Sequence, residues 1–200
     1  MTAAVAPDAD KDHSADKIAA RGLKGVVFLM FAFDVASIAA TFFIPIEAYQ
    51  SGASLPAVAG LMVVSALPSL AEFWLAEFID GSKHKRSIAL FCALASLPFF
   101  FALSVFMSGF LSRIVIALGI ETAAIFGSLA LESYATILSR RDRYGETASM
   151  LEGASTFGDL LAPVAIGIIT DALGFPFMFA IAATAFSLIA IYFIRSPIER

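Results

Sequence analysis

The chain has 200 residues, of which 60% are hydrophobic and only 15% are charged, and its mean hydropathy is +0.87. Soluble domains carry about 45–50% apolar and about 25% charged residues, so this composition excludes an ordinary water-soluble protein. With 13 basic against 17 acidic residues, the chain lacks the basic surface that nucleic-acid binding needs. Its single cysteine excludes an intrachain disulfide and a multi-cysteine metal site.

The amino-terminal segment is polar and rich in Ala and Asp, which predicts a disordered tail. It lacks the basic, apolar and small-residue regions that follow one another in a signal peptide. We expect three parts: a cytoplasmic tail over residues 1–21, a transmembrane domain over residues 22–195 and a short cytoplasmic tail over residues 196–200.

Six apolar runs follow the first tail, each longer than the roughly 18 residues with which a helix crosses a bilayer. Continuous runs of this length do not fit the alternating strands of a membrane barrel. The alternative, six buried helices of a soluble protein, needs a polar shell that a chain of this size cannot supply. The sequence therefore predicts an all-α membrane protein with six transmembrane helices. We expect the spans Gly25–Ile46, Ala57–Ile79, Ser87–Met107, Ile114–Leu138, Ala148–Thr170 and Ala172–Ile194.

The basic residues gather on one side of the expected membrane. The two termini, the second loop and the fourth loop hold all of the Lys and Arg residues except Arg113. The positive-inside rule then predicts that both termini are cytoplasmic, and we expect the cell (inner) membrane as the location.

Seven carboxylates lie inside the expected spans, and none of them lies in the third or the sixth span. A charge at the centre of a bilayer costs about 2.5–3.5 kcal/mol on an insertion scale, so these acids should face an interior or a wet cavity. Helical spacing aligns them with small and polar residues, which predicts that spans one, two, four and five line an interior while spans three and six face lipid. The seven acids are Asp34, Glu72, Glu77, Glu121, Glu132, Glu152 and Asp159.

Three of these acids, Asp34, Glu121 and Asp159, lie within about three residues of the middle of their spans, near the bilayer centre. No Lys, Arg or His occurs at that depth, so these carboxyls have no basic partner there. Such acids are suited to proton carriage or cation binding. We take these three and Glu72 as candidate proton- or substrate-binding residues. The alternative is a neutral carboxyl that is hydrogen-bonded to a neighbouring helix.

The sequence offers no catalytic constellation. The two histidines, His13 and His84, lie in the tail and in a loop, which argues against haem, di-iron and serine–histidine chemistry. No Gly-rich phosphate-binding loop of the nucleotide-driven pumps is present. We therefore expect neither enzyme activity, nor a metal, nor a cofactor.

Two short sequence pairs indicate a duplication of three helices. Ile46-Glu47-Ala48-Tyr49 at the end of the first span pairs with Leu131-Glu132-Ser133-Tyr134 near the end of the fourth. Ile79-Asp80-Gly81 after the second span pairs with Thr170-Asp171 and the following Gly174 after the fifth. Because three is an odd number, the second triplet must be inverted relative to the first, as in known transporter halves.

Two motifs resemble those of the major facilitator superfamily (MFS) of secondary transporters. The segment Asp80-Gly81-Ser82-Lys83-His84-Lys85-Arg86 is similar to the acidic and basic signature that this family carries between its second and third helices. Ala76 and Lys83 stand where that signature has glycines. In the fifth span, Gly158, Ala162-Pro163 and Gly167 are similar to the family's Gly-x-x-x-Gly-Pro-x-x-Gly-Gly.

The resemblance covers about residues 22–195 and implies half of an MFS-type fold, with two inverted three-helix repeats and peripheral third and sixth helices. It implies a half-transporter that moves a small solute by alternating access, coupled to protons, as a homodimer or beside a second six-helix half. A cation channel, a non-transporting scaffold or assembly protein and a truncated carrier are the alternatives. The residues implied for cytoplasmic gating are Asp80, Lys83, Lys85, Arg86, Arg140 and Arg143, and those of the helix-5 motif are Gly158, Pro163 and Gly167.

Overall fold

The computed structural model describes residues 9–105, 109–139 and 143–195, and every regular element in these ranges is helical. Six of its helical segments are long and apolar enough to cross a membrane, which confirms the prediction of a multi-pass all-α membrane protein. These spans are Gly22–Gln50, Leu55–Asp80, Lys85–Val105, Phe110–Leu138, Tyr144–Leu173 and Phe175–Arg195.

The first span consists of three consecutive helical pieces: α1 (Ala9–Ile38), the π-helical η1 (Ala39–Phe43) and α2 (Ile44–Gln50). The π-helical turn ends two residues before Pro45, whose ring removes one backbone donor from the ladder. The N–H of Ile44 donates to the carbonyl oxygen of Ala39, five residues back, so the turn is one residue wider than in an α-helix.

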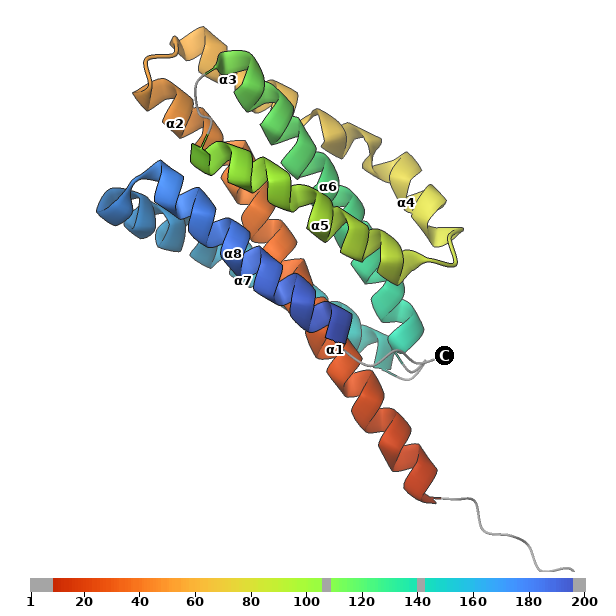
Figure 1. The fold of residues 1–200 in the computed structure, drawn as a ribbon. Coiled ribbons are helices and arrows are strands. Elements are labelled where there is room, and N and C mark those ends of the chain that lie inside the picture. The colour runs from red at the N-terminus through yellow and green to blue at the C-terminus, as the bar shows by residue number, and fades with distance from the viewer. Residues whose placement is uncertain (1–8, 106–108, 140–142, 196–200) are drawn as a thin grey trace, which may run out of the picture.

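In the structure α1 begins at Ala9, within the segment 1–21 that we expect to be a tail. Residues 1–8 lie outside the described residues. The segment from Ala9 to Arg21 contains four Ala residues, which favour a helix, and extending a helix that a neighbouring span has nucleated is much easier than starting one. As Figure 1 shows, this end of α1 projects beyond the other helices.

The second span is interrupted, whereas the last four are continuous. It comprises α3 (Leu55–Ser65), the 3₁₀-helical η2 (Leu67–Ala71) around Pro68, and α4 (Glu72–Asp80). The turn between the fifth and sixth spans lies at Gly174, whose φ of 85° disfavours a side chain. The expected break after Thr170 is therefore three residues too early. The continuous helices are α5 (Lys85–Val105), α6 (Phe110–Leu138), α7 (Tyr144–Leu173) and α8 (Phe175–Arg195).

The first and fourth spans form the centre of the bundle. About half of each is buried (56% and 50%), against 11% of the second and 17% of the fifth span. α1 packs against α6, α7 and α8, and α6 also packs against α4 and α5 (Figure 1). α5 and α8 pack against each other beside this pair. The second and fifth spans, which we expect to line an interior, are thus the least covered helices of the single chain.

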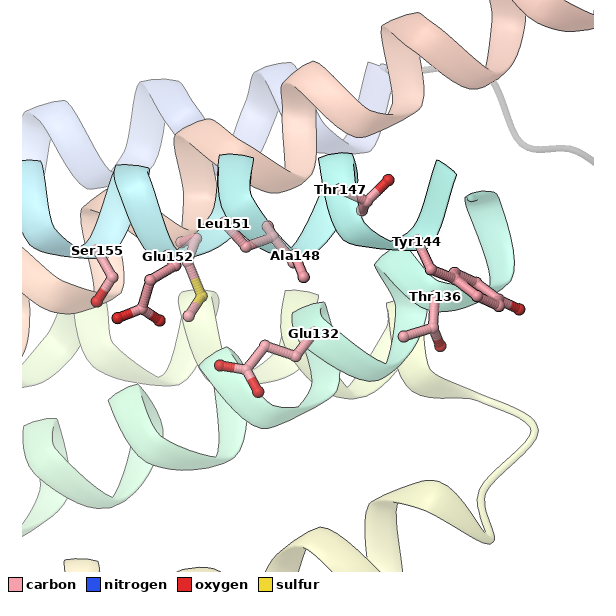
Figure 2. A pocket seen from close by; sticks show the side chains of 9 residues that line it. Glu132, Thr136, Tyr144, Thr147, Ala148, Leu151, Glu152 and Ser155 are labelled. Atoms are coloured by element: carbon pink, nitrogen blue, oxygen red, sulfur yellow. The ribbon is translucent and has the colours of Figure 1, made fainter. Parts of the chain in front are cut away.

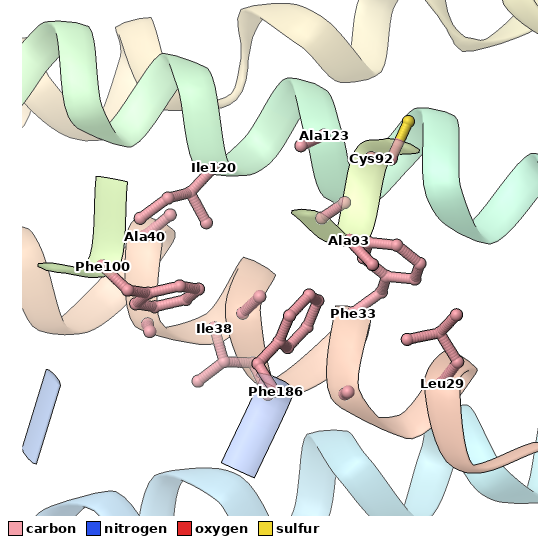
Figure 3. Close-up of a cluster of buried hydrophobic side chains, with 14 of the residues drawn as sticks. Leu29, Phe33, Ile38, Ala40, Cys92, Ala93, Phe100, Ile120, Ala123 and Phe186 are labelled. Carbon is pink, nitrogen blue, oxygen red and sulfur yellow. The ribbon is translucent and has the colours of Figure 1, made fainter. Parts of the chain in front are cut away.

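Aromatic rings fill the contact between the central helices and α5 and α8 (Figure 3). Phe33 of α1 and Phe186 of α8 meet edge to face with ring centroids 5.3 Å apart, and Phe100 of α5 lies 6.1 Å from Phe186. The Phe33 ring also lies against Gly127 of α6, where a Cβ atom would stand 2.1 Å from the ring carbon Cζ. Close packing of α1 on α6 therefore requires that residue 127 has no side chain.

We expect Gly127→Ala to destabilise the bundle by about 1–3 kcal/mol, because the added methyl group overpacks the core against Phe33. Thermal unfolding in detergent micelles measures the effect. Gly153→Ala, which adds its methyl group in open space on α7, is the matched control and should not be destabilising. If both variants unfold at the same temperature, the close contact of Phe33 with residue 127 is wrong.

Candidate functional site

Four helices place polar side chains around one small cavity. Its volume is about 180 Å³, and it is lined by Asp34 of α1, Glu72 of α4, Glu132 of α6 and Ser155 of α7, together with Ser128. These helices belong to the first, second, fourth and fifth spans, the four that carry acids. Two of the four candidate proton- or substrate-binding residues, Asp34 and Glu72, therefore lie at a common cavity.

Glu132 lines this cavity and two others. It also lines a pocket of about 420 Å³ between α6 and α7, with Glu152 and Tyr144 (Figure 2). A third pocket of about 320 Å³ lies between α4 and α6 and is lined by Glu132 and Asp80. We refer to the three pockets that share this residue as the Glu132 cavities. Glu132 and Glu152 are among the seven acids of the expected spans but not among the candidate binding residues, although Ser128 and Glu132 share a helix face one turn apart.

Asp34 and Asp159 lie close together because α7 approaches α1 closely. A Cβ atom at Gly158 would stand 3.1 Å from the Cβ atom of Asp34. Ser155, one turn before Asp159 on α7, lines the same cavity as Asp34. Oδ2 of Asp34 is buried and has no hydrogen-bond partner among the described residues. Gly158 of the helix-5 motif thus allows these two acids to meet.

Glu121 lies apart from the cavities, inside the contact between α6 and α1. Its side chain is only 6% exposed. The hydroxyl of Ser37 donates to its Oε1 at 3.1 Å, and its Oε2 has no partner among the described residues. The three acids near the bilayer centre are therefore divided: Asp34 and Asp159 lie together, whereas Glu121 has the geometry of a carboxyl hydrogen-bonded to a neighbouring helix.

The other two residues of the helix-5 motif do not contact the site. Pro163 lies inside α7 and is exposed. Gly167 has open space where a Cβ atom would stand, so nothing within the chain requires a glycine there.

Two residues of the basic signature after the second span, Lys85 and Arg86, bind carbonyl oxygens at the carboxyl ends of helices. The Nζ atom of Lys85, which is buried, donates to the carbonyl oxygens of Ile79 (2.9 Å) and Asp80 (2.7 Å) at the end of α4. Nη2 of Arg86 donates to the carbonyl oxygens of Phe193 (3.0 Å) and Ile194 (3.1 Å) at the end of α8. Cations at these positions satisfy carbonyls that a helix end leaves unpaired.

The remaining residues of the gating signature differ in their surroundings. The carboxylate of Asp80 accepts a hydrogen bond from the hydroxyl of Ser133 of α6. Lys83 is exposed in the loop, and Arg143 is exposed directly before α7. Arg140 lies outside the described residues.

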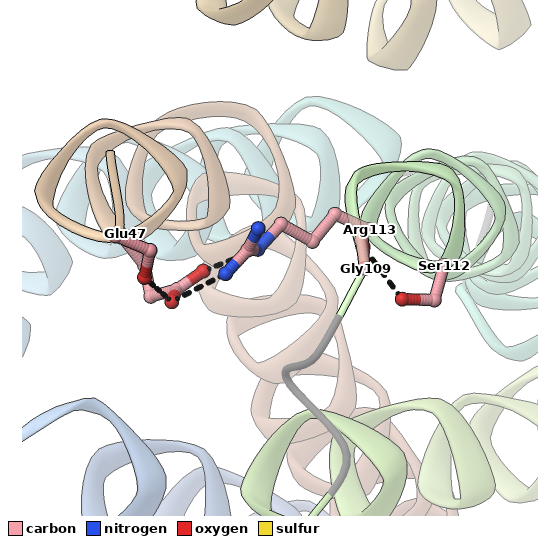
Figure 4. Close-up of polar contacts among 5 residues, drawn as sticks. Glu47, Gly109, Ser112 and Arg113 are labelled. Atoms are coloured by element: carbon pink, nitrogen blue, oxygen red, sulfur yellow. Dashed lines mark hydrogen bonds and ion pairs between the residues drawn. The ribbon is translucent and has the colours of Figure 1, made fainter. Parts of the chain in front are cut away.

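A buried ion pair at the opposite end of the bundle was not anticipated from the sequence. Nε and Nη2 of Arg113 donate to Oε2 and Oε1 of Glu47 at 2.7 and 2.9 Å (Figure 4). Both side chains are less than 10% exposed, and the hydroxyl of Ser51 donates to the same carboxylate. The pair joins the end of the first span to the start of the fourth. The only signal for it was that Arg113 is the single basic residue on its side.

The sequence pair that indicated a duplication places Glu47 and Glu132 at matching positions, yet their surroundings differ. The position that would correspond to Arg113 in the first half of the duplication is Phe28, which is exposed. Within the part of the chain that the structure describes, no basic side chain pairs with Glu132. One member of the repeated motif is therefore held in an ion pair, and the other faces cavities as an unpaired acid.

The polar side-chain groups that line the Glu132 cavities are carboxylates and hydroxyls. The described residues contain no group of three or more His, Cys, Asp or Glu side chains arranged to hold a metal ion. Among the described residues, none that lines the three pockets has a basic side chain. Such a surface can exchange protons and can attract a cation.

Comparison with known proteins assigns the chain to no family. No protein-family model matches it, and no curated protein matches it either.

Proposed function

We propose that the chain is one half of an MFS-type secondary transporter that moves a small solute across the membrane, coupled to protons. The observation that carries the proposal is the junction of four acid-bearing helices at Glu132, where Asp34, Glu72 and Ser155 line the same cavity. In inverted-repeat transporters the substrate and the coupling ion bind near the midplane, at the interface between repeats.

The exposed acids on α4 and α7 indicate that a second half covers this face of the chain. Asp159 lies near the middle of the fifth span and is exposed on α7, as Glu72 is exposed on α4. Leaving a carboxylate in contact with acyl chains costs about 2.5–3.5 kcal/mol, so this face needs a protein or water cover. Another copy of the chain with its termini on the same side supplies such a cover around a twofold axis along the membrane normal.

The lining of the cavities also restricts the solute. Because the described lining residues of the Glu132 cavities include acids and hydroxyls and no basic side chain, a cationic or neutral solute fits better than an anion. We place both termini in the cytoplasm and the protein in the cell membrane, since the basic residues gather at that end.

The decisive first measurement is the mass of the purified protein in lipid nanodiscs. We expect a dimer, or a complex with a second six-helix chain; a monomer alone would exclude a half-transporter.

Proton coupling is tested in proteoliposomes that enclose the pH dye pyranine. Addition of amino acids, sugars or organic amines from a panel should produce proton entry with one of these classes. We expect Asp34→Asn to abolish it, because the amide cannot bind and release a proton. Glu146→Gln, an exposed change in the first turn of α7, is the control. If Asp34, Glu121 and Asp159 are all replaced by amides and solute-driven proton entry is unchanged, a carrier mechanism through these acids is excluded.

A further inference from the structure

A large apolar groove lies between α4, α5 and α6. Its volume is about 790 Å³, and it shares no lining residue with the Glu132 cavities. Its walls are mostly aromatic and aliphatic, with Phe78 from α4, Phe91 and Phe99 from α5, and Phe126 from α6. Phe78 and Phe91 are 67% and 72% exposed, so the groove is open to the surroundings of the bundle.

The groove has the depth of one leaflet of a bilayer. It follows α5 from Ser87, two residues after the helix begins, to Phe99. These thirteen residues are separated by twelve steps of 1.5 Å and span about 18 Å. Half of a hydrocarbon core of about 30 Å is about 15 Å. One acyl chain of a phospholipid therefore fits along the groove from the membrane surface to the midplane.

At Ser87 the groove ends next to the basic loop between α4 and α5. Residues 81–86 hold Lys83, His84, Lys85 and Arg86 and no acid. Lys85 and Arg86 bind the carbonyl oxygens that end α4 and α8. Lys83 and His84 are exposed beside Ser87, and the carboxylate of the preceding Asp80 is held by Ser133 of α6. Two exposed basic residues therefore lie three and four positions before Ser87, where the lining of the groove on α5 begins.

We propose that this groove is a binding site for an anionic phospholipid, with one acyl chain between α5 and α6 and the phosphate at Lys83 and His84. Basic side chains at the cytoplasmic end of membrane helices attract anionic lipids by about 1 kcal/mol each. The site is independent of the proposed transport function, because it uses none of the acids of the Glu132 cavities.

Native mass spectrometry of the protein, released from nanodiscs with equal amounts of phosphatidylglycerol and phosphatidylcholine, tests the site. We expect retained lipid with phosphatidylglycerol favoured about fivefold, the factor that corresponds to 1 kcal/mol. Equal retention of the two lipids by the unmodified protein would overturn the proposal.

Two sets of variants separate the groove from the head-group site. Thr122→Phe, which fills the groove from an exposed position, should reduce retention of both lipids, whereas Thr184→Phe on exposed α8 should not. The double variant Lys83→Gln, His84→Gln should lose the preference for phosphatidylglycerol and keep phosphatidylcholine. Lys24→Gln, an exposed change on α1, is its control. The site is refuted if Thr122→Phe retains as much lipid as Thr184→Phe, or if the loop variant keeps the preference.

Discussion

Arg113→Met is expected to destabilise the folded protein by about 3–5 kcal/mol, the cost of leaving one partner of a buried ion pair uncompensated. The substitution removes the two guanidinium hydrogen bonds to Glu47, a residue only 5% exposed, and leaves its carboxylate with the hydroxyl of Ser51. Because the two spans are the central pair of the bundle, the loss should affect the whole fold. Unfolding in mixed micelles with increasing SDS, followed by circular dichroism, measures the change in free energy.

The double variant Glu47→Leu, Arg113→Met distinguishes the loss of a partner from the loss of packing. Replacing both charges with apolar groups of similar size is often neutral, so we expect most of the stability to return. Arg195→Gln, at the exposed end of α8, is the control for removal of a positive charge. A double variant as unstable as Arg113→Met alone would show that the ion pair is not the origin of the effect.

The six spans follow from the sequence because the bilayer imposes one dominant constraint, a helix about 20 apolar residues long. The structure accordingly has all six within a few residues of their expected ends. The break at Gly174 depends on one backbone conformation, which hydropathy does not register. The helical start at Ala9 was missed because polar composition predicts solvent exposure and does not separate an extended helix from an irregular chain.

Helix spacing predicts which residues share a face, but it does not predict which face meets which neighbour. The stripes of the acid-bearing spans therefore indicated that Asp34 and Glu72 share a cavity with other acids. They did not separate Glu121 from that set, since its burial depends on the hydroxyl of Ser37 on another helix. The pairing of Glu47 with Arg113 joins residues far apart in the chain, and no local pattern specifies such a contact.

Glu132 differs in its surroundings from Glu47, which stands at the matching position of the similar segment Ile46-Glu47-Ala48-Tyr49. Its counterpart in the repeated motif, Glu47, is neutralised by Arg113, and this pair closes the end of the bundle away from the basic loops. Glu132 has a carboxylate in the same motif but faces three pockets. Among the described residues an ion pair holds the carboxylate of Glu47 and none holds that of Glu132, so we expect Glu132 to be the residue that takes a proton.

Glu132→Gln is therefore expected to reduce solute-driven proton entry to the level of protein-free liposomes. The amide keeps the volume of the side chain and removes the only carboxylate common to the three pockets, so the fold should remain while exchange stops. Glu132→Asp, which keeps the carboxyl group one methylene closer to α6, should retain part of the activity. Glu77→Gln on exposed α4, which lines none of these pockets, is the matched control. Glu47 is not a candidate for proton coupling, because its carboxylate is already ion-paired with Arg113. Unchanged proton entry in Glu132→Gln would therefore place the coupling residue among Asp34, Asp159 and Glu121. It would also leave the Glu132 cavities without a role in transport.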